Sequence, residues 1–114
     1  MTSPEDLRRR RQGLNQALFR EVNERLGETA PDGSAALDLV CECADGGCTE
    51  PLRIAVVEYE RVRRDPRRFI VRPEHVVRDI ERVVGDAADH RVVEKVDPRA
   101  VAMVVQHDPR AGRA

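Results

Sequence analysis

The chain has 114 residues, of which 36% are charged, and its formal net charge is −1. This length allows one domain with one modest core, and three aromatic residues without tryptophan make an aliphatic core the expectation. The near-neutral charge excludes a protein that binds nucleic acid through bulk basicity. No apolar run is long enough to span a membrane, and no signal peptide is visible. We therefore expect a cytoplasmic protein without membrane contact.

The first predicted element is a helix over residues 3–27. Ser3 suits its N-cap, Pro4 its first turn, and Gly27 its end. Five aliphatic side chains form one stripe along it at helical spacing, namely Leu7, Leu14, Leu18, Val22 and Leu26. We expect this helix to pack on the rest of the chain or to bind a protein partner or a second copy. Residues 28–36 read as a linker by composition.

A small α+β domain is predicted over residues 37–106, followed by a flexible polar tail over 107–114. Its predicted elements are strands at 37–43, 52–56 and 69–71, a helix at 57–65, and a β-hairpin from 80–84 and 90–96. Valine spacing over 76–84 also fits a helix, and the apolar stretch 99–105 has no predicted type. The expected fold class is α+β, with a long N-terminal helix before a zinc-stabilised domain of short strands, one short helix and a β-hairpin.

Three cysteines, Cys41, Cys43 and Cys48, lie within eight residues. An odd number leaves one thiol over in any disulfide scheme, and disulfides are rare in the cytosol, so metal ligation fits better. Three cysteines and one histidine form a standard structural zinc site. We expect the strand to break or bulge at Cys41-x-Cys43, so that both side chains reach one ion. The alternatives are buried free thiols and a redox-sensitive thiol group.

The fourth ligand is one of three histidines, His75, His90 and His107. His75 follows Pro73 in a turn after a strand, where its ring can be held toward a site formed by another segment. His90 begins a strand and fits a packing role on the hairpin. His107 lies in the expected tail, whose ordering costs about 1–2 kcal/mol per residue. These positions favour His75.

Several segments carry a joint pattern: Phe19-Arg-Glu-Val-Asn-Glu-Arg25, Cys41-Glu-Cys43-x4-Cys48-Thr-Glu50, Glu58-Tyr59-Glu60-x-Val62-Arg63, Asp65-Pro66-x-Arg68-Phe69, His75, Val92-Val-Glu-Lys95 and Asp108-Pro109-Arg110. Together they resemble a family of small proteins of high-GC bacteria to which no activity is assigned, over roughly residues 14–110. That family has Pro-Gly-His where this chain has Pro73-Glu74-His75, which supports His75 as a ligand. It usually has an aromatic residue at the place of His90, which supports a packing role there. The predicted site is thus Zn²⁺ bound by Cys41, Cys43, Cys48 and His75.

A basic window over residues 61–72 begins within the predicted short helix, and its candidate nucleic-acid contacts are Arg61, Arg64, Arg67 and Arg68. The cysteine segment, in contrast, carries five acids and no base over residues 32–50. Such a segment repels phosphate and lacks the stacking aromatics of nucleic-acid knuckles. We therefore favour a solvated, ion-paired basic face over an RNA or DNA surface.

Nothing in the sequence predicts catalysis. No glycine-rich phosphate loop is present, and three cysteines with one histidine leave zinc no open position for a substrate. The expected function is a non-catalytic, zinc-binding accessory or regulatory protein that acts through protein–protein contacts. The alternatives are a nucleic-acid or ribosome-associated module that uses the arginines, and a zinc–thiolate redox switch.

Overall fold

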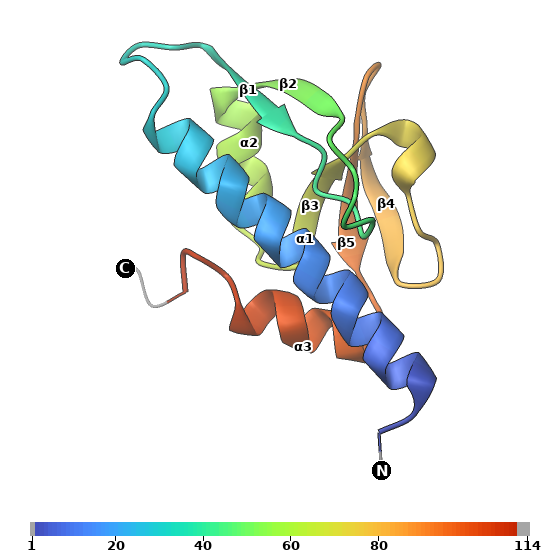
Figure 1. Ribbon diagram of the computed structural model, residues 1–114. Coiled ribbons are helices and arrows are strands. Elements are labelled where there is room, and N and C mark those ends of the chain that lie inside the picture. The colour runs from blue at the N-terminus through green and yellow to red at the C-terminus, as the bar shows by residue number, and fades with distance from the viewer. Residues whose placement is uncertain (1, 112–114) are drawn as a thin grey trace.

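The computed structural model of the protein describes residues 2–111, and its fold is mixed α+β (Figure 1). A long helix, α1 (Pro4–Glu28), lies across the shorter elements. These are β1 (Ala36–Val40), β2 (Pro51–Ala55), α2 (Val56–Val62), β3 (Arg68–Val71), the 3-10 turn η1 (Pro73–His75), β4 (Glu81–Asp86), β5 (Arg91–Lys95) and α3 (Pro98–Gln106). Within the described residues, no helix combines the length and apolar character needed to cross a membrane.

The strands form two small antiparallel sheets. β1 pairs with β2, and β5 lies between β3 and β4 in a three-stranded sheet. The predicted β4–β5 hairpin is confirmed, with a register shift between Val83 and Gly85. The core between the sheets is mostly aliphatic and contains Leu37, Leu39, Leu52, Ile54, Phe69, Ile70, Val71, Val93 and Val104.

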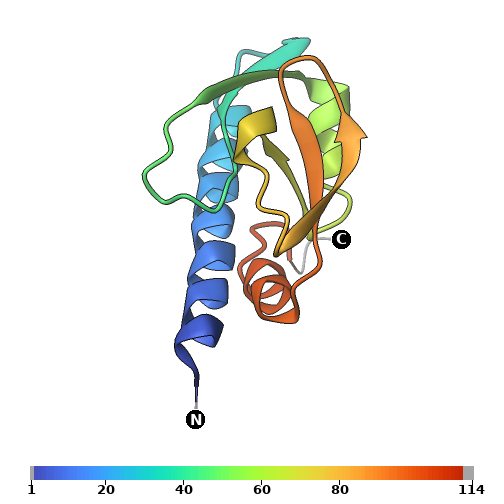
Figure 2. The same cartoon turned by 90° about the vertical axis from the view of Figure 1, so that its right-hand side faces the viewer.

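The N-terminal helix begins where the sequence predicts. Ser3 Oγ accepts a hydrogen bond from the Asp6 amide at 3.1 Å, and Asp6 Oδ2 accepts one from the Ser3 amide at 3.3 Å. This reciprocal pairing satisfies two amide donors that the first turn would otherwise leave free. α1 packs against α3 and β1, and it forms one side of the molecule in Figure 2. The linker at 28–36 therefore does not separate the helix from the domain.

The face of α1 that packs on the domain is polar. Gln16, Arg20 and Asn23 are buried there, together with Arg9, Gly13 and Ala17. The predicted aliphatic stripe lies on the opposite face, where the side chains of Leu7, Leu18, Val22 and Leu26 are 57%, 52%, 44% and 38% exposed. The helix thus packs on the domain as expected, but through the face that hydropathy does not predict.

Two features of the C-terminal part add to or differ from the expectation. The stretch 99–105, for which the sequence predicts no type, lies in a second short helix, α3, and Asp97 caps it by accepting hydrogen bonds from the Arg99 and Ala100 amides. The expected flexible tail is anchored in its first part, because Asp108 and Arg110 form ion pairs with Arg63 and Glu24 at 2.6 and 2.7 Å. Residues 112–114 of that tail lie outside the described residues.

Candidate metal centre

The cysteine segment begins where β1 ends. The predicted strand over 37–43 ends at Val40. The Cys41 amide donates to Glu50 O at 2.8 Å, whereas the Glu42 amide donates to Ile70 O of the other sheet, also at 2.8 Å. Cys41 and Cys43 reach the same site, and the expected break is not required for this, because residues two apart in an extended chain lie on the same face.

A tight turn returns the chain so that Cys48 joins the other two cysteines. Asp45 Oδ1 accepts a hydrogen bond from the Gly47 amide at 2.9 Å, and Asp45 O accepts one from the Cys48 amide at 3.0 Å. Such a side-chain-to-backbone turn is typical of aspartate. Gly46 lies against Asn15 of α1, whose Nδ2 donates to Ala44 O at 2.9 Å. The long helix therefore holds the turn in place.

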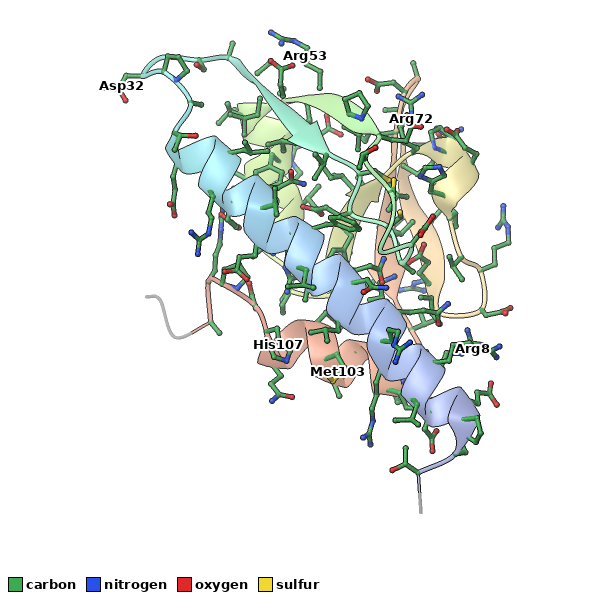
Figure 3. The ribbon with its side chains drawn as sticks, in the orientation of Figure 1. Arg8, Asp32, Arg53, Arg72, Met103 and His107 are labelled. Atoms are coloured by element: carbon green, nitrogen blue, oxygen red, sulfur yellow. The ribbon has the colours of Figure 1, made fainter. Side chains whose placement is uncertain are left out.

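His75 comes to the cysteines from the other sheet, through η1. This turn follows β3 directly and is closed by a hydrogen bond from the His75 amide to Arg72 O at 2.9 Å. Arg72, labelled in Figure 3, stands at the start of η1. His75 Nδ1 lies 3.4 Å from Cys41 Sγ and 3.6 Å from Cys48 Sγ.

The four side chains fit a tetrahedral ion. Their ligand atoms all lie within 4.8 Å of one another. Zinc bonds of about 2.3 Å to sulfur and about 2.0–2.1 Å to nitrogen place a sulfur and a nitrogen about 3.6 Å apart at tetrahedral angles. The two distances from Nδ1 of His75 agree with this spacing. Cys41, Cys43, Cys48 and His75, the residues chosen from the sequence, are therefore brought together as one Cys3His cluster.

The surroundings favour a thiolate at Cys43 and disfavour one at Cys41 and Cys48. All three cysteines are buried, and the Arg72 amide donates a hydrogen bond to Cys41 Sγ at 3.2 Å. A hydrogen bond from the Cys41 thiol lowers the pKa of Cys43 to about 6, and the same bond raises the pKa of Cys41. Burial raises the pKa of Cys48. The unfavourable approach of three thiolates is relieved by a bound divalent cation, which supplies the missing positive charge.

Glu42 differs from its expected role as part of an exposed acidic segment. It is fully buried, and its carboxylate accepts hydrogen bonds from Asn23 Nδ2 at 2.8 Å and from the Ile70 amide at 3.0 Å. Burial raises the pKa of this carboxyl. Glu42 therefore joins α1 to β3 from the residue between Cys41 and Cys43. The alternation of side chains in the Cys-Glu-Cys sequence could have indicated that Glu42 points away from the cysteines.

The other two histidines lie outside the cluster. His90 is buried between two carboxylates, with its Nδ1 2.9 Å from Asp89 Oδ1 and its Nε2 3.0 Å from Glu58 Oε1. It links the hairpin to α2. His107 is exposed at the end of α3.

The basic window is largely ion-paired. Arg67 pairs with Asp65 at 3.1 Å and Arg68 with Glu94 at 3.3 Å. Arg61 and Arg64 are exposed and form no ion pair within residues 2–111. The four arginines chosen as candidate nucleic-acid contacts thus divide into two paired and two free side chains.

No family model, curated protein or solved structure matches this chain. Its own geometry defines its class, which is a small α+β protein with a Cys3His cluster consistent with a metal-binding domain.

Proposed function

We propose that the protein binds one Zn²⁺ through Cys41, Cys43, Cys48 and His75, and that it is a non-catalytic accessory or regulatory protein stabilised by this ion. The observation that carries the proposal is the approach of three buried sulfurs and one imidazole nitrogen to within 4.8 Å of one another. Sulfur-rich tetrahedral ligand sets favour zinc among the common divalent cations.

A structural role follows from what the ion would connect. The cysteines belong to the segment between β1 and β2, whereas His75 follows β3 of the second sheet. The two sheets share no strand. Zinc bonds would therefore join them, and binding would contribute directly to the free energy of folding. Four protein ligands also leave no open coordination position, which argues against a catalytic metal.

A role through protein contacts is supported by the exposed aliphatic stripe of α1. Large contiguous apolar surface on a folded protein is typical of an interaction site. The long helix therefore offers the protein a contact surface.

Metal analysis of the purified protein tests the proposal. We expect about one zinc per chain, the number that a single four-ligand site holds. Removal of the metal with a chelator should lower the unfolding temperature, and added zinc should restore it. Cys43→Ser should lose both the metal and the stabilisation, while Thr49→Ser, an exposed change in the same segment, should keep both. A metal-free protein of unchanged stability would contradict a structural zinc.

A second candidate is a zinc–thiolate redox switch, and one observation favours it. A cavity of about 160 Å³ lined by Cys43, Ala44 and His75 opens beside the cluster. It offers hydrogen peroxide a path to Cys43, the one cysteine of residues 2–111 that lines it. Two thiolates would give up two electrons to form a disulfide, the peroxide would be reduced to water, and zinc would be released. Zinc release by dilute peroxide, reversed by a dithiol and zinc, tests this role.

A further inference from the structure

We propose that two copies of the chain associate through the aliphatic stripe of α1, formed by Leu7, Leu14, Leu18, Val22 and Leu26, with the two helices antiparallel. This inference deepens the proposed contact role by naming the partner, and it rests on the proposed function only in taking α1 as the contact surface. It does not depend on which metal the cluster holds.

The rotation of α1 about its own axis is fixed by its polar face. Gln16 Nε2 donates to Glu42 O at 3.2 Å, Arg20 Nη2 to Val104 O at 2.6 Å, and Asn23 Nδ2 to Val40 O at 2.8 Å. Turning the stripe inward would leave these buried donors and acceptors unpaired, which destabilises a buried contact. The stripe therefore stays on the surface of the single chain.

The stripe is a row of aliphatic side chains and not a single exposed residue. It runs over about 28 Å of helix from Leu7 to Leu26 at 1.5 Å per residue. In Figure 2 the loop between β1 and β2 runs alongside the upper part of α1, and the lower part is open on its outer side; Leu7, Leu18, Val22 and Leu26 remain exposed. Single exposed aliphatic residues are ordinary, whereas a continuous row of them indicates a surface that another molecule covers.

The spacing of the stripe fits a copy of itself. Leu14, Leu18, Val22 and Leu26 recur every four residues and so form one continuous ridge. Ridges of this kind pack into each other when two helices cross at about 50°. A two-fold axis near the middle of the ridge brings the same patch of both copies together, as in most symmetric dimers. Leu14 and Leu18 of one copy then lie opposite Leu26 and Val22 of the other.

The charges beside the ridge select the antiparallel arrangement. Arg8, Arg10 and Arg11 are exposed along the first half of α1, and none of them forms an ion pair within residues 2–111. In the second half, Glu21 pairs with Arg25 of the same helix at 3.3 Å, whereas Glu28 is exposed and forms no ion pair within residues 2–111. Antiparallel helices bring Glu28 of each copy toward the arginines of the other. Parallel helices would set six arginines against one another, which like-charge repulsion disfavours.

Sedimentation velocity of the full, zinc-loaded chain tests the association. We expect a dimer at chain concentrations of roughly 1–100 µM, which corresponds to a dissociation constant in the micromolar range. Leu18→Glu should raise the dissociation constant at least about tenfold, because it buries an unpaired carboxylate at the interface. Val57→Glu is the matched control, since Val57 is 72% exposed on α2 away from the stripe, and it should leave the dimer intact. A wild-type chain that is monomeric over the whole range would overturn the proposal.

Charge reversal tests the direction of the helices. Arg10→Glu with Arg11→Glu, and separately Glu28→Arg, should each weaken self-association, and mixing the two variants should restore a heterodimer. Stronger self-association of the arginine variant would show parallel helices and overturn the antiparallel arrangement. Zinc content is measured on the same samples. A monomer with full zinc rejects the dimer alone, whereas a metal-free dimer rejects the zinc proposal alone.

Discussion

Lys95 of β5 and Glu81 of β4 lie directly opposite each other and form an ion pair that is closed to solvent. Glu81 also accepts hydrogen bonds from Gln16 Nε2 of α1 at 3.1 Å and from the Val77 amide at 2.9 Å. A single buried carboxylate thus holds the hairpin, the segment before it and the long helix together. Lys95 is the only lysine of a chain whose other basic residues are arginines.

Removal of one member of this pair should be strongly destabilising. Lys95→Met leaves the Glu81 carboxylate buried without its cation, and Glu81→Gln leaves the ammonium group without its anion. We expect each to lower the free energy of unfolding by about 3–5 kcal/mol in urea denaturation. The double variant should lose less than the sum of both, because it buries no unpaired charge. Arg53→Met, which breaks the exposed pair with Asp38, is the control and should change little. Additive losses would contradict a coupled pair.

His75→Ala should weaken zinc binding, because it removes the only nitrogen ligand of the cluster. Changes to groups that merely orient ligands lower affinity about 10–100-fold, so loss of a ligand should lower it at least as much. Competition with a chromogenic chelator measures this, and reaction with a thiol reagent should become faster as the cysteines are uncovered. His107→Ala, at an exposed site, should match the wild type. Normal retention by His75→Ala with loss in His90→Gln would move the ligand to His90.

Zinc binding should release about two protons from the cysteines near pH 7, because zinc takes all three as thiolates. The pKa of Cys43 is lowered to about 6, so this thiol is already mostly ionised. The pKa values of Cys41 and Cys48 are raised, so both bring protons that must leave. Affinity should therefore fall as the pH is lowered. Calorimetry in buffers of different ionisation enthalpy counts the protons, and a binding reaction that releases none would contradict this site.

The site was more predictable than the packing around it. Three cysteines so close in sequence restrict the geometry, and the placement of residues two apart on one face of an extended chain is a local property of the backbone. The β4–β5 hairpin and the Ser3 cap are local in the same way. Asp97 before Pro98 is a helix-capping signal that could have predicted α3, although the apolar stretch after it does not by itself distinguish a helix from a strand.

The orientation of α1 could not be read from hydropathy. Gln16, Arg20 and Asn23 face inward because carbonyls at Glu42, Val104 and Val40 and a carboxylate at Glu42 need donors there, and these acceptors lie 17 to 84 residues away in sequence. A rule that places apolar residues inside has no access to such long-range pairing. The same limit explains why Asp108 and Arg110, which pair with distant residues, resembled a free tail.

Gly13 marks the closest approach of α1 to α3, and its replacement gives the final prediction. A Cβ atom at this position would lie 2.8 Å from Ala100 O and 3.0 Å from Ala100 Cα, both of which are backbone atoms that cannot rotate away. Gly13→Ala should therefore destabilise the protein, although alanine favours an isolated helix by about 1 kcal/mol. Gly27→Ala is the matched control in the same helix, since its nearest neighbour is Leu37 Cδ1 at an ordinary 3.7 Å. Thermal unfolding should show a loss for Gly13→Ala and no loss for Gly27→Ala. A stabilising Gly13→Ala would mean that the two helices are not packed this closely.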